Sequence, residues 1–94
     1  MAFEWDEKKR LANLRKHGFD FKDCARIFNS SYTSKLDVRF DVGEPRFRAV
    51  GLLNGRIVSV AYTERRNIIR VISMRKADQH EEADYFETFG GIAD

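Results

Sequence analysis

The residues best suited to chemistry in this sequence are arginines of its second half: Arg46, Arg48, Arg65, Arg66, Arg70 and Arg75. Side chains two positions apart on a strand share a face, so Arg46 and Arg48 would project together. A guanidinium group keeps its charge and forks onto phosphate or carboxylate oxygens. The cluster therefore indicates a partner that carries phosphates. The alternative is a solvated sheet face on which arginines pair with Asp37, Asp41 and Glu44.

The net charge of +2 conceals a strong asymmetry along the chain. Residues 35–76 hold ten Lys or Arg against four Asp or Glu, whereas residues 77–94 hold six acids and no Lys or Arg. A strand region this basic repels itself unless an anion is present, and RNA or DNA would supply one. Tyr62, Phe47 and Trp5 are candidates for stacking on bases, although each also suits a hydrophobic core.

Several familiar sites are absent from the sequence. It has no glycine-rich phosphate loop and no His-Glu-x-x-His motif, and one cysteine with two histidines leaves no metal site of the usual spacing. We expect neither metal nor cofactor, and Cys24 reads as a small buried hydrophobe. The chain also lacks a secretory signal and a membrane-spanning run, which favours one cytoplasmic domain over residues 1–94 with no membrane partner.

The elements that must position the arginines can be predicted from local signals. Asp6 and Gly18 bracket a helix over about 7–17, and a second helix covers about 21–29. Asn54-Gly55 suits a type I′ turn between strands 47–53 and 56–63. A third strand covers 68–74 and a fourth covers 32–40. Asp78 and Glu81 fit a capping box that opens a C-terminal helix over about 79–89.

This order predicts an α+β fold. The expected architecture is a small antiparallel β-sheet of about four strands, with two N-terminal helices and one C-terminal helix.

Blocks along nearly the whole chain resemble one known family. They are Phe3-Glu4-Trp5-Asp6, the run from Asn13 to Gly18, Gly43-Glu44-Pro45-Arg46, the run from Val60 to Arg65, the run from Ile69 to Ala77, and Glu82 with Tyr85. In this order they resemble the BrnT family of type II toxins, small ribonucleases with a RelE-like fold.

The resemblance implies an activity and a partner. A BrnT-like toxin cleaves RNA, chiefly mRNA, and so stops translation and growth. Its partner is a BrnA-like antitoxin with a ribbon-helix-helix DNA-binding part, and the complex represses its own operator DNA. The residues agree on one point independently, which is an arginine-lined sheet suited to a polyanion.

A mechanism that needs no metal fits these residues. The ribose 2′-OH attacks the adjacent phosphate, and arginines stabilise the developing charge. Glu64 is the candidate base, because it is the carboxylate set among arginines. Lys76 or Tyr85 is the candidate acid. The remaining site residues are the phosphate clamps Arg65, Arg70 and Arg75, and the RNA-binding residues Arg46, Arg48, Trp5, Lys16 and His17.

Three alternatives remain open at this point. Glu64 could be structural and pair with Arg46 across the sheet, and His17 at a helix end could serve only the helix dipole. The protein as a whole could also be a nucleic-acid-binding or protein-interaction module without catalysis, because a basic sheet suits binding equally well.

Overall fold

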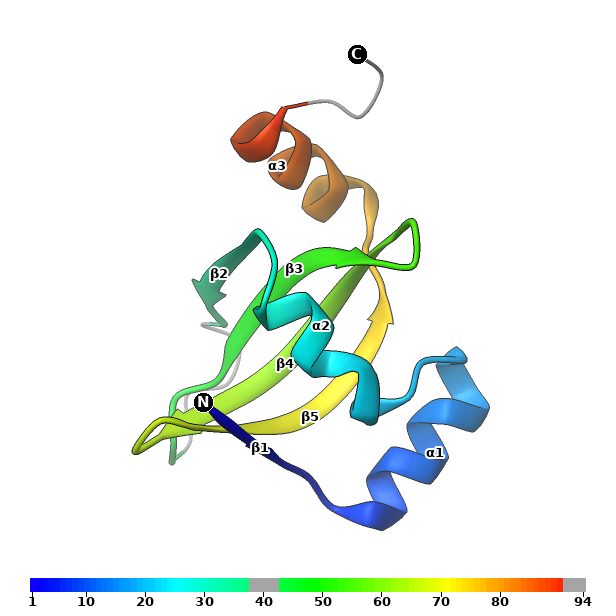
Figure 1. Ribbon diagram of the computed structural model, residues 1–94, viewed down its shortest axis with the longest axis vertical. Coiled ribbons are helices and arrows are strands. Elements are labelled where there is room, and N and C mark those ends of the chain that lie inside the picture. The colour runs from blue at the N-terminus through cyan, green and yellow to red at the C-terminus, as the bar shows by residue number, and fades with distance from the viewer. Residues whose placement is uncertain (38–42, 91–94) are drawn as a thin grey trace.

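The computed structural model describes residues 1–37 and 43–90 and confirms the α+β class (Figure 1). The elements in chain order are β1 (Ala2–Glu4), α1 (Glu7–His17), the 3₁₀ turn η1 (Phe21–Asp23), α2 (Cys24–Phe28), β2 (Tyr32–Leu36), β3 (Phe47–Leu53), β4 (Arg56–Arg65), β5 (Ile68–Lys76) and α3 (Gln79–Phe89). None of the helices in this described part is long and apolar enough to span a membrane.

The sheet differs from the predicted one in number and direction of strands. In the described part of the chain it has five strands in the order β1-β5-β4-β3-β2, and β1 runs parallel to β5 with Ala2 opposite Ile68. The sheet is therefore mixed rather than antiparallel. A three-residue strand whose partner lies far along the chain carries no local signal. The predicted strand 32–40 is β2 as far as Leu36, and its residues 38–40 lie outside the described part.

Strands β3, β4 and β5 are joined by two hairpins, and the two residues at the turn of each hairpin have left-handed backbone. Asn54 and Gly55 have φ of 51° and 80°, which confirms the predicted turn. Arg66 and Asn67 adopt the same conformation with φ of 53° and 67°. This second turn is tighter than the predicted polar loop, so β4 and β5 are both longer than expected.

Helix α1 begins and ends as predicted but attaches to the sheet by an unexpected residue. The Asp6 carboxylate accepts hydrogen bonds from the first-turn amides, and Gly18 ends the helix with φ of 78°. Leu11 and Leu14 are exposed, whereas Asn13 is buried. The Asn13 amide donates to the Met74 carbonyl at 2.9 Å and accepts from the Met74 N–H at 3.1 Å. It thus pairs with the edge of β5 as a further strand would.

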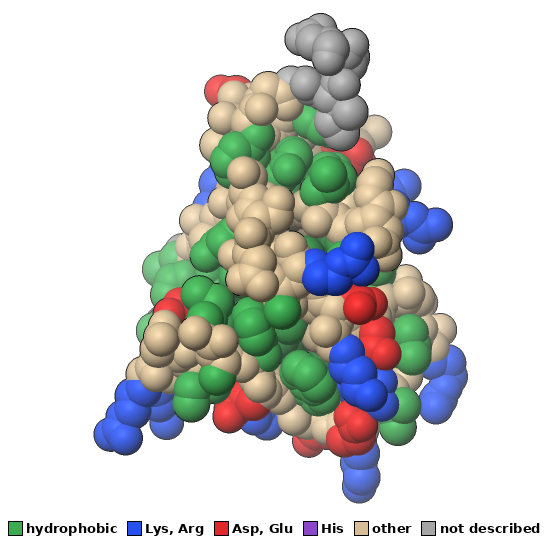
Figure 2. All heavy atoms as spheres, in the orientation of Figure 1, with side chains coloured by type: hydrophobic (Ala, Val, Ile, Leu, Met, Phe, Trp, Pro, Cys, Tyr) green, Lys and Arg blue, Asp and Glu red, His purple; other side chains and the backbone are tan. Residues whose placement is uncertain are grey.

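The second helix is shorter than the predicted 21–29, because η1 precedes the five-residue α2. Both pack on the side of the sheet that we call the α2 face, which looks toward the viewer in Figure 1. Its core combines side chains from helix and strands: Phe21, Cys24, Ile27, Phe28, Ala49, Val58, Val60, Tyr62, Ile69, Val71 and Met74. Figure 2 shows apolar side chains across the middle of this side.

The opposite side, the α3 face, is covered by a helix only at one end. Tyr85 of α3 packs with Val50, Ile57 and Ala77 in a small second cluster. The predicted capping box is confirmed, since the Asp78 carboxylate accepts from the Glu81 N–H and the Glu81 carboxylate accepts from the Asp78 N–H. The rest of the α3 face carries the polar residues that form the candidate site.

Candidate nucleic-acid interface

Arginines from two neighbouring strands lie on the α3 face of the sheet. Arg75 is paired with Ser59 of β4, and Arg70 is paired with Thr63. Paired residues of antiparallel strands project on the same side, and Ser59 and Thr63 are four positions apart on one strand. Arg70 and Arg75 therefore share the α3 face.

A β-bulge makes this arrangement possible. Residues five positions apart on a regular strand point to opposite faces. Between Ala61 and Tyr62 the register with β5 shifts, since Ala61 is paired with Ser73 and Tyr62 with Val71. Ile72 is the extra residue, and it restores the alternation so that Arg70 and Arg75 face the same way.

Arg46, Arg70 and Lys9 line one hollow of about 250 Å³ on this face, together with Thr63, Glu44 and Ile72. A second hollow of about 220 Å³ adjoins it and shares Glu44, Thr63 and Arg70. Arg65 and Arg66 line the second hollow as well. Four arginines and one lysine thus surround two connected depressions.

Carboxylates pair with several of these cations. Arg65 is hydrogen-bonded to Glu44, and Arg70 Nη1 donates to Glu4 Oε2 at 3.0 Å. Both arginines are well exposed, so each ion pair contributes at most about 1 kcal/mol and can be exchanged for another anion.

Glu64, the predicted base, lies apart from these arginines. It is paired with Ile69, whose side chain belongs to the core of the α2 face. By strand alternation the Glu64 side chain projects on that side, opposite to Thr63 and Arg65. Among the described residues Glu64 makes no hydrogen bond or ion pair, so the alternative pairing with Arg46 is also not formed. Glu44 is the carboxylate that lines the arginine hollows.

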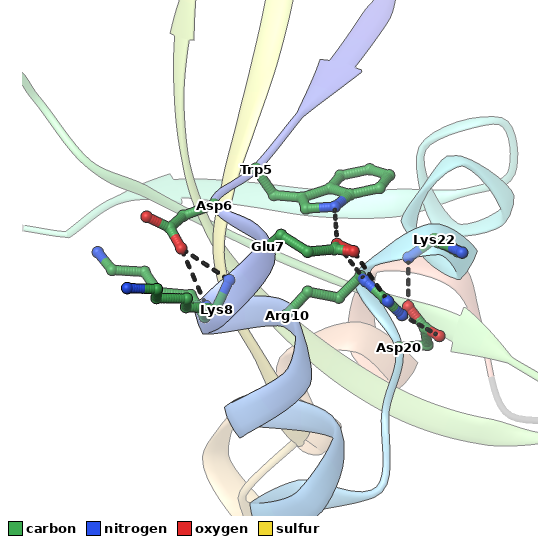
Figure 3. Close-up of polar contacts among 8 residues, drawn as sticks. Trp5, Asp6, Glu7, Lys8, Arg10, Asp20 and Lys22 are labelled. Carbon is green, nitrogen blue, oxygen red and sulfur yellow. Dashed lines mark hydrogen bonds and ion pairs between the residues drawn. The ribbon is translucent and has the colours of Figure 1, made fainter.

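Trp5 contacts the protein rather than an open groove. Its ring packs against the core of the α2 face, and its indole N–H donates to Glu7 at 3.3 Å. Figure 3 shows that Glu7 also accepts from Arg10, which reaches across to Asp20. This chain of contacts joins β1, α1 and η1. Hydrogen bonding to Arg10 outweighs desolvation and lowers the pKa of Glu7.

The two predicted proton donors lie at the α3 end of the sheet. Tyr85 is buried in the second hydrophobic cluster, where its ring packs on Phe86 and Phe89. Lys76 is exposed and lines a different hollow with Arg56, Glu82 and Phe86. Neither side chain lines the hollows that hold Arg46 and Arg70, which favours a packing role for Tyr85.

The remaining predicted residues divide between surface and core. Lys16 and His17 are exposed in the last turn of α1, while Lys9 in its first turn is the α1 residue that reaches the arginine hollow. Tyr62 is buried, and its hydroxyl shares a hydrogen bond with Ser34 at 2.6 Å. Cys24 is buried as expected, and burial raises the pKa of its thiol to about 11.

Arg48 lies in a partly buried polar network that sequence reasoning missed. Its guanidinium Nη1 donates to the Ser59 hydroxyl at 3.0 Å, and Ser59 donates to Glu81 at 3.1 Å. Both oxygens of Glu81 accept from Arg75, at 2.8 and 3.1 Å. Burial raises the pKa of Glu81, but the hydrogen bonds from Arg75 and Asp78 outweigh it and the net shift is downward.

Lys9, Glu44, Ser59, Thr63 and Glu81 thus join the site without having been predicted for it. Glu44 stands two positions before Arg46, and alternation from Glu44 to Arg48 would have placed it on their face. Ser59 and Thr63 are polar and alternate along β4 with Val58, Val60 and Tyr62, which belong to the core of the α2 face. This alternation places Ser59 and Thr63 on the α3 face. Lys9 and Glu81 carry no such signal, because they come from helices.

Fold and site together define a class: a small α+β protein whose mixed sheet presents arginines on a face suited to a polyanion. Residues 5–81 match the model of the family described as the ribonuclease toxin, BrnT, of type II toxin–antitoxin systems. The chain belongs to the BrnT family, as the resemblance of its motifs indicated. A toxin of this kind has an RNA target and an antitoxin partner. No curated protein matches the chain.

Proposed function

We propose that the α3 face is the RNA-cleaving site of a metal-independent endoribonuclease. The observation that carries this proposal is the set of arginines around two adjoining hollows on one face. They are Arg46 just before β3, Arg65 at the end of β4, Arg66 in the following turn and Arg70 in β5. Their ion pairs with Glu4 and Glu44 are exposed, so phosphates can compete for the guanidinium groups. The family supports the reaction class, and the arginine-lined hollows support this location for the reaction.

The chemistry we propose is attack of a ribose 2′-OH on the neighbouring phosphate. The bond from phosphorus to the 5′-oxygen breaks, which leaves a 2′,3′-cyclic phosphate and a 5′-hydroxyl end. Arg46 and Arg70 hold the phosphate and stabilise the charge that develops on its oxygens. Arg65 and Arg48 extend the basic track along the strand of RNA, where contacts to phosphates make affinity fall with salt.

Proton transfer in this mechanism needs a base and an acid. We assign the base to Glu44 rather than Glu64, because Glu44 lines the same hollows as Arg46 and Arg70. Its ion pair with Arg65 holds the Glu44 carboxylate beside the second hollow. Lys9 lines the same hollow and is the group we assign to protonate the departing 5′-oxygen. Each transfer would contribute about 10²–10⁴-fold.

The partner we propose is a BrnA-like antitoxin with a ribbon-helix-helix DNA-binding part. The complex would repress its own operator DNA, as the family resemblance implies. The relationship to the RelE-like fold stays a prediction.

The test is incubation of purified protein with a defined RNA in EDTA, followed by analysis of fragment ends. We expect 5′-hydroxyl fragments from the unaltered protein. Arg46→Ala and Arg70→Ala should each slow cleavage by roughly 10²-fold, as loss of one charge-stabilising donor does. Arg26→Ala is the matched control, because Arg26 bonds Asn54 from α2 on the other side of the sheet.

The outcomes separate the proposal from its alternatives. If Glu44→Gln cleaves normally and Glu64→Gln does not, our assignment of the base is wrong. A requirement for Mg²⁺ would refute the metal-independent mechanism. RNA that is bound but left intact would indicate the non-catalytic binding module.

A further inference from the structure

A single carboxylate connects two arginines that come from different strands. Glu81, in the first turn of α3, accepts a forked pair of hydrogen bonds from Arg75 of β5. It also accepts from the Ser59 hydroxyl of β4, which in turn accepts from Arg48 of β3. The network therefore crosses three neighbouring strands on the α3 face.

The hydrogen bonds of Ser59 have a fixed direction. A hydroxyl has one hydrogen, so when Ser59 donates it to Glu81 only its lone pairs are left for Arg48. Ser59 is fully buried, and no alternative donor from solvent reaches it. An ionised Glu81 therefore sets the orientation of the hydroxyl, and the hydroxyl sets the position of the Arg48 guanidinium.

The network is sheltered but not sealed from solvent. The side chains of Glu81 and Arg75 are 17% and 29% exposed. Arg75 thus keeps part of its guanidinium group available while Glu81 holds the other part. On the far side, Arg48 Nε lies 3.6 Å from Asp37 Oδ2, so Arg48 is held from two directions.

We infer that Glu81 is a positioning residue, which through the buried Ser59 hydroxyl holds both Arg48 and Arg75 in the geometry that RNA cleavage requires. This inference deepens the proposed function and rests on it. A small misplacement of such groups lowers the rate of a reaction strongly, whereas binding alone does not require the same precision.

Ser59→Ala breaks the link to Arg48 and leaves the forked pair between Glu81 and Arg75 intact. We expect the single-turnover cleavage rate to fall roughly 10-fold or more, because a displaced Arg48 no longer holds the RNA in the position that the reaction requires. RNA affinity should change less than about threefold, because no charge is lost. Ser30→Ala is the matched control and should cleave normally, because Ser30 is an exposed residue shortly after α2.

Glu81→Gln weakens the contact with Ser59 and the forked pair with Arg75 together. We expect a larger loss of rate than in Ser59→Ala, with the folded structure retained in circular dichroism. If Glu81 instead masks the arginines from RNA, its neutralisation would tighten RNA binding and speed cleavage. That result would overturn the inference.

A second measurement keeps the inference testable without activity. Arginine side-chain ¹⁵N NMR measures how fast each guanidinium group rotates. In the unaltered protein this rotation should be slow for Arg48 and Arg75. Ser59→Ala should speed rotation of the Arg48 group alone, because only the contacts on its Asp37 side then hold it, and Glu81→Gln should speed rotation of both groups. Unchanged rotation of Arg48 in Ser59→Ala would overturn the inference. If the unaltered protein fails to cleave RNA while rotation responds as expected, the proposed function fails and the positioning contacts stand.

Discussion

The attachment of α1 to the sheet offers a sharp test of the fold, because it depends on one polar side chain. Asn13 is 7% exposed and makes three hydrogen bonds. Its amide nitrogen donates to the carbonyls of Phe19 and Met74, and its oxygen accepts from the Met74 N–H. Asn13→Ala removes all three bonds and leaves the buried Met74 N–H without a partner.

The expected loss follows from these contacts. At about 1 kcal/mol for each hydrogen bond, Asn13→Ala should lower the free energy of unfolding by about 3 kcal/mol. A 94-residue domain has about 5–14 kcal/mol in total, so the loss is a large share. The melting temperature should fall by about 12–24 °C, at 4–8 °C for each kcal/mol.

Urea unfolding followed by circular dichroism measures this difference. Asn29→Ala is the matched control, because Asn29 is exposed and should change stability by less than about 0.5 kcal/mol. Asn13→Asp has the same shape but places a carboxylate against two carbonyls, so it should lose as much as Asn13→Ala. A loss below about 1 kcal/mol in Asn13→Ala would refute the reasoning that this side chain acts as a substitute strand.

Other perturbations test the turns, the core and the charges. Gly51→Ala should cost about 1–3 kcal/mol in urea unfolding, since its Cβ would stand 2.7 Å from the buried Ile27 side chain. Arg66→Gly should stabilise by about 0.5–1 kcal/mol by relieving left-handed backbone; a loss would contradict this. The lowered pKa of Glu81 contributes stability above its ordinary 4.5 that disappears as pH falls through its folded value, so Glu81→Gln should flatten the acid decline. In the folded protein Cys24 should resist thiol reagents until urea is added, because burial raises its pKa to about 11.

Much of the fold was predictable because its signals are local. Asp6 and Gly18 bracket α1, Asp78 and Glu81 open α3, and Asn54-Gly55 turns one hairpin. Each acts within a few residues of backbone, so the sequence alone locates it. The short strand β1 was missed because its partner is residues 68–70, and three residues carry too little pattern to be recognised.

The candidate site was predictable in kind but not in detail. Arginine spacing indicated a polyanion-binding sheet, and the structure places Arg46 and Arg70 in one hollow. Glu64 was predicted to lie among these arginines, but it does not line their hollows, because strand alternation turns it to the other face with its partner Ile69. Glu44 takes that place, two residues before Arg46.

By itself, the sequence determined the class of fold, the ends of α1 and α3, the central hairpin and the family of the chain. The tertiary structure decided which side chains share a face. Arg70 and Arg75 are an odd number of positions apart, and only the bulge at Ile72 turns both to the α3 face. Glu81 reaches Ser59 only because α3 folds back against the sheet, where it packs on β3 and β2. Such contacts depend on strand register and helix docking, which are set by packing between distant segments rather than by any local run of residues.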